Sequence, residues 1–330
     1  MIYFYYLNSK MSLNRPIWKL RDWIDETKLV NSYLSRNLNA IDYLKKNPDK
    51  IDWYYLSYNI NAIELLKENL DKVNWFNISS NENALDIILK NENKIYYNLL
   101  SINKNTIDYL NKNPKKICWY YFSSNPNAIK ILKENQDKIN WTSLSANINA
   151  IELLKENPEK INWTVLSSNI NAIELLRENK SKINWTTLSG NVNAIELLKE
   201  NPKKINWYNL SINLNSIEIL KKNQNKIHWY ALSFNPNGIE LLREQIKRNP
   251  DKINWQALSS NENAIELLKE NPNKICYRNL SSNPAIFELD YEEMKKNNKE
   301  IEQELISEVM KPSRVFKYGG ITYLKELFGD

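Results

Sequence analysis

The sequence is poor in the residues on which most protein chemistry depends. Its 330 residues include two cysteines, one histidine and five glycines. Two cysteines cannot supply a disulfide framework, and their scarcity favours a reducing compartment. The only glycine pair, Gly319-Gly320, lacks the lysine and strand context of a phosphate-binding loop. These absences argue against a disulfide scaffold, a zinc cluster and a nucleotide-binding enzyme.

Long hydrophobic runs and a strong charge imbalance are also missing. No apolar run approaches the ~18 residues of a membrane span. The opening MIYFYYL lacks the basic lead and cleavage site of a secretory signal, so we expect a protein that is not secreted. The net charge of +6 arises from 45 Lys+Arg against 39 Asp+Glu. This balance is mildly basic and does not by itself require a nucleic-acid partner.

What the chain has instead is a repeat of 22 residues. The segment INWTSLSANINAIELLKENPEK at 139–160 returns as INWTVLSSNINAIELLRENKSK at 161–182 and as INWTTLSGNVNAIELLKENPKK at 183–204. Self-similarity at a short fixed period indicates a solenoid, in which each unit buries its apolar face only by stacking on its neighbours. We number positions 1–22 within each unit. The units begin at Leu29, Ile51, Val73, Ile95, Ile117, Ile139, Ile161, Ile183, Ile205, Ile227 and Ile253, and a degenerate twelfth begins at Ile275.

Two helices are predicted in each unit. Positions 12, 13, 15 and 16 give one apolar stripe at helical spacing, and this predicts a helix B of about nine or ten residues. Asn125-Pro126 suits its start, and the Asn at position 19 suits a left-handed cap at its end. Positions 3–7 predict a short helix A of one turn, with Asn140 as N-cap and Trp141 and Leu144 on one side. The tryptophan column at position 3 is interpreted as core rather than as a platform for stacking bases.

The tenth unit, 227–252, has 26 residues. Four extra residues are close to one helical turn, so they leave the apolar stripe on its face. A longer helix B is the favoured interpretation, and a protruding recognition element is the alternative.

Three polar positions recur through the full units: Ser at 7, Asn at 9 and Lys at 22. We expect Ser and Asn to close helix A and cap helix B, where backbone groups would otherwise be buried unpaired. The alternative is a ladder that grips a peptide backbone.

The lysine column is less determined by the sequence. Each lysine either pairs with a neighbouring acid or helix carbonyl, or it contributes to a ligand-facing ridge that tracks phosphates. Glu at positions 14 and 18 leaves each unit close to neutral, which makes nucleic acid the less favoured partner. The candidate ridge consists of Lys50, Lys72, Lys94, Lys116, Lys138, Lys160, Lys182, Lys204, Lys226, Lys252 and Lys274.

Catalytic and metal-binding residues are not expected. His228, Cys118 and Cys276 all occupy position 2, a column that tolerates substitution. They fall in different units, too far apart in a stacked array to form a disulfide, a zinc cluster or a nucleophilic pair. We therefore predict a non-enzymatic protein without cofactors.

The ends of the chain are predicted to be caps, because a terminal repeat has one face without a neighbour. Residues 1–28 form the N-terminal cap, in which Trp18, Leu20, Trp23 and Ile24 lie close to helical spacing. Residues 29–285 form a solenoid of about eleven and a half units. Residues 286–330 form a helical C-terminal cap, with an exposed charged helix over 290–311 and a short helix over 321–328.

The consensus INWxxLSxNxNAIELLKENPDK, over about 29–285, resembles the short Asn/Leu-rich repeat proteins of giant, mimivirus-like DNA viruses. The tail Lys311-Pro312-Ser313-Arg314-Val315 is similar to the segment that commonly closes such proteins, although Gly319-Gly320 departs from their usual ending. The resemblance implies a viral source and a repeat-scaffold role, without catalytic residues.

The predicted fold is thus an all-α solenoid of two-helix repeats with helical caps. The expected function is a scaffold for interaction with a viral or host protein in the host cytoplasm, the virus factory or the virion. A structural component of the virion and a phosphate- or nucleic-acid-binding protein are the alternatives, and no membrane partner is expected.

Overall fold

The computed structural model describes residues 16–309, and its chain divides into two compact units. The larger unit spans 22–286 and contains all of the repeats. The smaller unit, in its described part, contains 16–21 and 287–309. The predicted all-α array of 22-residue repeats is confirmed in the larger unit.

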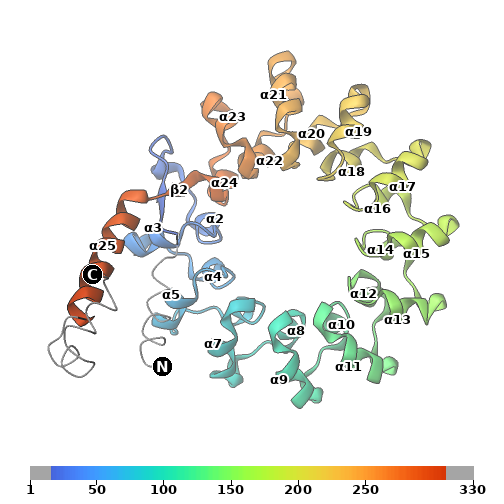
Figure 1. The fold of residues 1–330 in the computed structure, drawn as a ribbon, viewed down its shortest axis with the longest axis horizontal. Coiled ribbons are helices and arrows are strands. Elements are labelled where there is room, and N and C mark those ends of the chain that lie inside the picture. The colour runs from blue at the N-terminus through green and yellow to red at the C-terminus, as the bar shows by residue number, and fades with distance from the viewer. Residues whose placement is uncertain (1–15, 310–330) are drawn as a thin grey trace, which may run out of the picture. The chain divides into compact units, whose positions relative to one another are not determined.

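The short A helices lie on the inner side of the array (Figure 1). They are α2 (Asn31–Leu34), α4 (Trp53–Leu56), α6 (Trp75–Ile78), α8 (Tyr97–Ile102), α10 (Trp119–Phe122), α12 (Trp141–Ala146), α14 (Trp163–Leu166), α16 (Trp185–Leu188), α18 (Trp207–Ile212), α20 (Trp229–Leu232), α22 (Trp255–Ser260) and α24 (Tyr277–Leu280).

The B helices lie on the outer side (Figure 1). They are α3 (Ile41–Lys46), α5 (Ile63–Glu68), α7 (Leu85–Leu89), α9 (Ile107–Lys112), α11 (Ile129–Glu134), α13 (Ile151–Lys155), α15 (Ile173–Glu178), α17 (Ile195–Glu200), α19 (Ile217–Lys222), α21 (Ile239–Arg248) and α23 (Ile265–Glu270).

Single turns of 3₁₀-helix join these helices. Before helix B they are η4 (Glu82–Ala84), η6 (Lys104–Thr106), η8 (Pro126–Ala128), η14 (Pro236–Gly238), η16 (Glu262–Ala264) and η18 (Pro284–Ile286). In the segments that lead into helix A they are η2 (Glu26–Lys28), η3 (Pro48–Lys50), η5 (Glu92–Lys94), η7 (Pro114–Lys116), η9 (Gln136–Lys138), η10 (Pro158–Lys160), η11 (Lys180–Lys182), η12 (Pro202–Lys204), η13 (Gln224–Lys226), η15 (Pro250–Lys252) and η17 (Pro272–Lys274).

Helix A begins as the sequence predicts, and position 2 is its N-cap. The Oδ1 atom of Asn140 accepts a hydrogen bond from the Ser143 backbone N–H at 2.9 Å. This satisfies one of the first-turn donors that have no partner inside a helix. The helix then runs for only four to six residues in each repeat.

Helix B is shorter than the predicted nine or ten residues, because only five or six residues are α-helical in repeats 1–9 and 11. Asn at position 9 begins a separate turn: Asn125 Oδ1 accepts from the Asn127 N–H at 3.0 Å, with Pro126 at the first position. Ala128, the next residue of that turn, has φ −86° and ψ −4°, and the α-helix starts only after it.

The predicted left-handed cap at position 19 is wrong. Asn135 has φ −134° and ψ 50°, so its backbone stays at negative φ. Its side chain instead donates from Nδ2 to the Ile131 carbonyl at 2.9 Å. The side chain therefore satisfies a carbonyl at the end of helix B that a left-handed turn would otherwise have satisfied through the backbone.

The continuous core is made of the aliphatic residues at positions 6, 12 and 16. In repeat 7, Leu166, Ala172 and Leu176 are all 0% exposed. The tryptophans are half-buried instead, Trp163 among them, so they border the core without belonging to its fully buried part. Methylene and methyl groups from both helices thus share one core, and its burial is the main source of stability.

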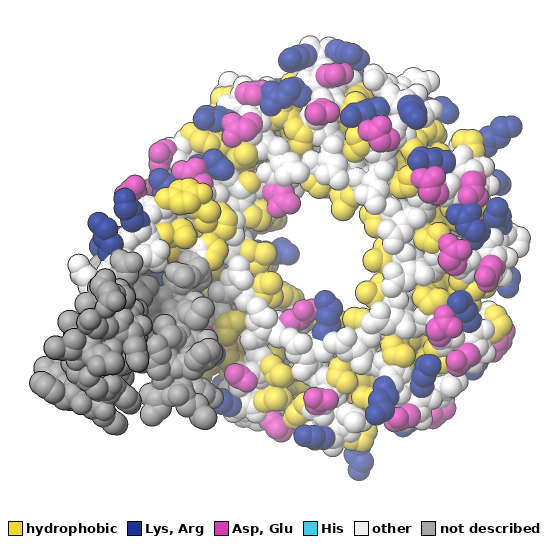
Figure 2. All heavy atoms as spheres, viewed as in Figure 1, with side chains coloured by type: hydrophobic (Ala, Val, Ile, Leu, Met, Phe, Trp, Pro, Cys, Tyr) yellow, Lys and Arg dark blue, Asp and Glu magenta, His cyan; other side chains and the backbone are white. Residues whose placement is uncertain are grey.

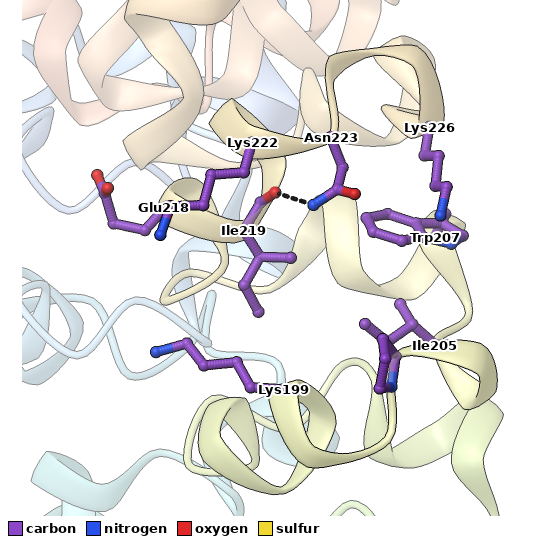
Figure 3. Close-up of a pocket in the computed structure, with 9 residues that line it drawn as sticks. Lys199, Ile205, Trp207, Glu218, Ile219, Lys222, Asn223 and Lys226 are labelled. Atoms are coloured by element: carbon purple, nitrogen blue, oxygen red, sulfur yellow. Dashed lines mark hydrogen bonds between the residues drawn. The ribbon is translucent and has the colours of Figure 1, made fainter.

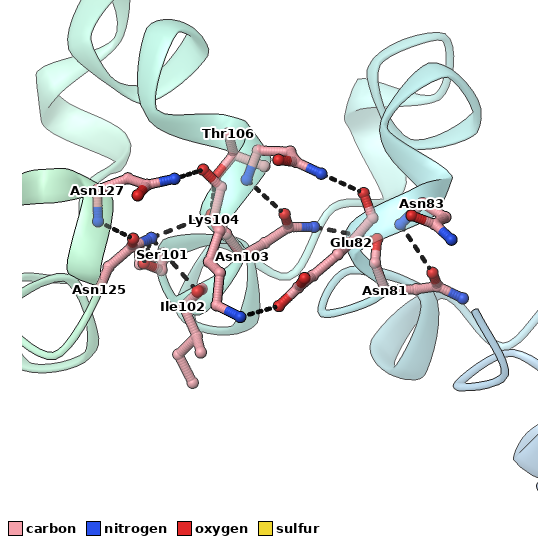
Figure 4. A network of polar contacts seen from close by, with 11 residues as sticks. Asn81, Glu82, Asn83, Ser101, Ile102, Asn103, Lys104, Thr106, Asn125 and Asn127 are labelled. Carbon is pink, nitrogen blue, oxygen red and sulfur yellow. Dashed lines mark hydrogen bonds and ion pairs between the residues drawn. The ribbon is translucent and has the colours of Figure 1, made fainter. Parts of the chain in front are cut away.

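A ladder of asparagine and serine side chains fixes each repeat to the one before it (Figure 4). Asn103 Nδ2 donates to the Asn81 carbonyl at 3.1 Å, and Asn125 Nδ2 donates to the Ser101 and Asn103 carbonyls at 3.1 and 3.0 Å. Ser101 Oγ accepts from the backbone N–H of Cys118, in the next repeat, at 3.0 Å. The structural interpretation of these columns is confirmed, because the backbone that they hold is the protein's own.

The array closes on itself. Asn37, in the first repeat, donates from Nδ2 to the carbonyls of Ser281 and Asn283 at 3.1 and 2.9 Å. The Val30 N–H donates to Ser281 Oγ at 2.8 Å, and Asn39 Nδ2 donates to the Pro284 carbonyl. These bonds join the same repeat positions as in any internal junction. The unit 22–286 is therefore a closed ring of twelve repeats, and its end repeats cover one another (Figure 1).

The residues before the first repeat complete the twelfth. The turn η2 ends in Lys28, whose Nζ lies 5.3 Å from the centroid of the Tyr277 ring. Lysine at position 22 and the aromatic residue at position 3 meet in the same way within other repeats, for example Lys160 and Trp141 at 4.5 Å. The predicted boundary at residue 28 differs from the observed one at 21/22, because 22–28 contribute to the ring.

The tenth repeat takes its four extra residues into helix B. Helix α21 has 10 residues, and Gln245 from the insertion is buried. The ladder continues across it, since Asn261 Nδ2 still reaches the Asn235 carbonyl at 3.2 Å. The longer-helix interpretation is confirmed.

The smaller unit begins with a strand where helical spacing predicted a helix. Strand β1 (Trp18–Leu20) pairs antiparallel with β2 (Phe287–Leu289). The helical prediction is wrong here, because backbone pairing with distant residues is not visible in local spacing. The predicted charged helix is confirmed as α25 (Tyr291–Val309), and Asp290 Oδ1 caps it by accepting from the Glu293 N–H. The segments 311–315 and 321–328 lie outside the described residues.

Candidate binding surfaces of the repeat ring

The A helices on the inner side of the ring are almost free of charge. Among the twelve A helices of the larger unit, Arg278 is the one charged residue within the helix bounds. Figure 2 shows most Lys, Arg, Asp and Glu side chains around the outer edge, while apolar and uncharged atoms, with a few charged side chains among them, border the central opening. The two sides of the ring therefore offer different chemistry to a partner.

Aromatic side chains occupy position 4 of the A helices in five repeats. Their exposed fractions lie between 42% and 56%, although they are large and apolar. They are Tyr54, Phe76, Tyr120, Tyr208 and Tyr230. Repeats 6, 7 and 8 carry threonine there instead, at Thr142, Thr164 and Thr186. Exposed aromatic groups of this kind mark interaction surfaces more often than they stabilise a fold.

One end of this aromatic surface forms a pocket in repeats 1 and 2. Arg36, Leu38, Tyr54, Tyr55 and Tyr58 line a hollow of about 440 Å³. The Arg36 guanidinium lies 5.6 Å from the centroid of the Tyr55 ring. An arginine held over an aromatic face can still present its N–H groups to a ligand.

A second aromatic group surrounds the single histidine. The His228 ring lies 4.8 Å from the ring of Tyr208 and 6.5 Å from that of Tyr230, measured between centroids. Its Nδ1 atom accepts from the Ala231 N–H at 3.3 Å, so histidine caps α20 as asparagine caps the other A helices. The structure thus gives His228 a capping role on the inner side.

The predicted lysine ridge lies close to the tryptophan column. In seven repeats the structure places the lysine at position 22 within 4.5–5.2 Å of the aromatic ring at position 3 of the same repeat. These lysines are Lys72, Lys94, Lys116, Lys138, Lys160, Lys182 and Lys226. Sequence reasoning did not foresee this cation–π contact, although the fixed spacing of Lys and Trp was its signal.

Two lysines of the column are held more firmly than the rest. Lys50 Nζ lies 2.5 Å from the Tyr43 hydroxyl, and Lys116 Nζ lies 2.7 Å from the Tyr109 hydroxyl. The Tyr43 hydrogen bond raises the pKa of Lys50. Hydrogen bonds to Tyr109 and Tyr97 raise the pKa of Lys116 well above its ordinary value. Both ammonium groups therefore remain charged, and each one bonds a tyrosine of its own repeat.

Ion pairs join successive B helices at some junctions of the outer surface. Arg177 Nη1 lies 2.5 Å from Glu200 Oε1, and the hydrogen bond from Arg177 lowers the pKa of Glu200. Arg243 and Glu270 occupy the same positions, 17 and 18, at a later junction, and the pKa of Glu270 is lowered for the same reason. These pairs cover the groove between neighbouring B helices with matched charge.

One outer groove contains a cavity. Between repeats 8 and 9 there is a cavity of about 250 Å³, with Ile205, Trp207 and Ile219 on its walls (Figure 3). Lys199 and Lys222 border it on one side, and Lys226 stands over the Trp207 ring at 4.8 Å. Sequence reasoning missed this site, although its signal was the lysine at position 18 in repeat 9, where most central repeats have glutamate.

The two cysteines are separate and not bonded to each other, and both are half-buried. Cys276 Sγ contacts Asn279 Oδ1 at 3.2 Å, at the N-cap position of α24. Within residues 16–309, no group of three or more His, Cys, Asp or Glu side chains is arranged to hold a metal ion. Over the same residues, every helix is too short or too polar to cross a membrane.

Comparisons with protein-family models, with curated proteins and with solved structures find no match to this chain.

Proposed function

We propose that this protein is a non-enzymatic scaffold that binds another protein through the inner wall of its repeat ring. The observation that carries the proposal is the row of exposed aromatic side chains at position 4 of the A helices, represented by Tyr54, Tyr120 and Tyr230. Nothing in the geometry of the A helices requires an aromatic residue there, because Thr142, Thr164 and Thr186 occupy the same place.

The chemistry of the wall favours a protein partner over a polyanion. Protein interfaces are enriched in Tyr, Trp, Phe and Arg and depleted in other charged residues at their centres. The inner wall follows this pattern, with aromatic groups in five repeats and two arginines, Arg36 and Arg278. Arg278 Nε donates to the Tyr33 hydroxyl at 2.8 Å, and its guanidinium stacks over that ring. A nucleic-acid backbone would need many more cations than these two.

The cellular setting rests on the resemblance to repeat proteins of giant DNA viruses. The partner is then a viral or host protein of the infected cell. Measuring the amount of this protein in purified particles and in infected cytoplasm distinguishes a virion component from a scaffold that acts before assembly.

The test is site-specific photo-crosslinking in infected cells. A benzophenone amino acid at Tyr54 or Tyr208 should crosslink one defined protein, whereas the same group at Glu174 on outer helix α15 should not. Excess wild-type protein should compete the crosslink away, whereas Tyr54→Thr and Tyr208→Thr variants should compete poorly if the aromatic rings supply the affinity. Equal crosslinking from Glu174, or no protein adduct from either inner position, would reject the inner wall as the binding surface.

A further inference from the structure

The groove between repeats 8 and 9 lacks the carboxylate that most other junctions carry at position 18. Position 17 of one repeat faces position 18 of the next, and Arg177–Glu200 and Arg243–Glu270 form close ion pairs at these positions. At the junction of repeats 8 and 9 the same two positions hold Lys199 and Lys222. Two cations therefore border this groove, as Lys67 and Lys90 do between repeats 2 and 3, whereas a cation and an anion meet at most of the other junctions.

The anions within reach do not compensate for this excess. Lys199 Nζ pairs with Glu196 of its own helix at 2.7 Å. Glu218, also on the groove, lies 3.6 Å from Lys221. Among residues 16–309, Lys222 makes no ion pair within 4 Å. A carboxylate from outside would gain charge-assisted hydrogen bonds that no described residue now supplies.

The same groove also has an apolar space beside position 15, where repeats 1 and 4 carry a larger side chain. In repeats 1 and 4, position 15 is tyrosine, and the Tyr43 and Tyr109 hydroxyls reach Lys50 and Lys116. Repeat 9 has the smaller Ile219 at this position and leaves a cavity of about 250 Å³. A cavity of ~150 Å³ is large enough to hold a benzene ring. This space therefore accepts one large aliphatic or aromatic side chain.

From these two features, we propose that the groove between α17 and α19 binds an acidic peptide segment. The peptide inserts one apolar side chain against Trp207, Ile205 and Ile219 and places a carboxylate near Lys199 and Lys222 (Figure 3). Lys226, held over the Trp207 ring, attracts a second carboxylate. A nucleic acid would use the lysines but would leave the apolar walls unsatisfied.

This site is distinct from the inner wall on which the proposed function rests. Its walls come mainly from the outer helices and the 3₁₀ turns that follow them. Either surface can bind its partner without the other, and variants in the groove leave the exposed aromatic rings of the inner wall in place.

The experiment measures binding of a fluorescein-labelled peptide, Asp-Glu-Asp-Phe-Asp-Glu, to the full chain by fluorescence anisotropy. Lys222→Glu restores the carboxylate found at position 18 of neighbouring repeats and should weaken binding at least tenfold. Ile219→Tyr places in the cavity the residue that repeats 1 and 4 already carry, and it should weaken binding to a similar degree. A peptide with serine in place of phenylalanine should bind at least fivefold more weakly than the parent.

Matched controls separate local effects from general ones. Lys112→Glu makes the same charge change at position 18 of repeat 4, where position 15 is Tyr109 and its hydroxyl bonds Lys116, and it should leave peptide binding within twofold of wild type. Melting curves of all variants identify any that fail to fold, and Lys222→Glu on the exposed side of α19 remains informative if Ile219→Tyr does not fold.

Several results would overturn the proposal. Equal effects of Lys222→Glu and Lys112→Glu would mean that only net charge matters. Equal binding of the serine peptide would remove the apolar pocket from the argument. A labelled twelve-residue oligothymidine that binds through Lys222 while the peptide does not would assign the groove to nucleic acid instead.

Discussion

The inner and outer helices of the ring share one core but differ in what they show to solvent. The twelve inner helices carry a single charged residue, Arg278, whereas each of the eleven outer helices carries at least one. The residues of the outer helices change little from repeat to repeat, and some of their charged side chains form ion pairs such as Arg177–Glu200. The inner positions vary from tyrosine to threonine while the backbone stays the same. Uniformity on one side thus maintains the stack, and variation on the other leaves room for recognition.

The largest expected effect would show whether the two sides depend on one core. Leu166 of α14 and Leu176 of α15 are both 0% exposed. Replacing either by alanine should cost about 2–5 kcal/mol of unfolding free energy, because each leaves a cavity in a packed interior. Urea denaturation followed by circular dichroism measures both values. If only one substitution destabilises the protein, the inner and outer helices do not fold as one unit.

The second prediction tests whether the inner and outer helices continue around a closed ring, by comparing the closing junction with an internal one. Asn37 and Asn59 make the same three hydrogen bonds, Asn37 at the closing junction and Asn59 at an internal one. Alanine at either position should cost about 1–3 kcal/mol, since buried backbone groups lose their partners.

Hydrogen exchange distinguishes these two variants. Asn37→Ala should raise exchange in repeats 1 and 12 together, and Asn59→Ala should raise it in repeats 1 and 2. An Asn37→Ala protein with wild-type stability and unchanged exchange would mean that the ring is open in solution.

The third prediction tests whether the inner aromatic rings are needed for stability. Tyr208→Thr and Tyr230→Thr introduce the residue that repeats 6–8 carry at the same position. Because both rings are about half exposed, each change should stay within about 0.5 kcal/mol of wild type. A loss of more than about 2 kcal/mol in chemical denaturation would mean that the aromatic residues hold the fold.

The smallest effect concerns the outer ion pairs and their dependence on pH. Arg177 lowers the pKa of Glu200, so this carboxylate adds stability above its ordinary pKa. The contribution is lost as the pH falls through the lowered value in the folded protein. A small difference in melting temperature between wild type and Glu200→Gln should therefore be present at pH 7 and vanish in acid. A difference that persists in acid, or in 1 M salt, would exclude an ionic origin.

The repeat architecture was predictable because local signals recur at a fixed spacing. Asn140 predicted the start of helix A, and Asn125-Pro126 predicted the turn before helix B. Both signals depend on side chains that bond their own neighbouring backbone, so the sequence alone contains them. The four-residue insertion in repeat 10 was interpretable for the same reason, because one added turn keeps the apolar face in place.

Features that depend on geometry between distant residues could not be predicted in this way. Ring closure requires the accumulated rotation of all repeats to bring Asn37 to Ser281 and Asn283, and no short segment specifies that rotation. The pairing of β1 with β2 likewise joins residues from opposite ends of the chain. The groove at Lys222 could not be predicted, because a lysine in place of glutamate at one position does not by itself indicate a binding site. Only the structure shows that Lys199 of the preceding repeat borders the same cavity.

Closure also limits how such a chain can evolve. An open array can gain or lose a unit at its end and keep its remaining contacts, but a closed one cannot. Adding a thirteenth unit would alter the angle between all neighbouring pairs at once, including the bonds from Asn37 and Val30 across the seam. The number of repeats is therefore constrained by the geometry of the ring, although the closing junction has the same hydrogen bonds as the internal ones.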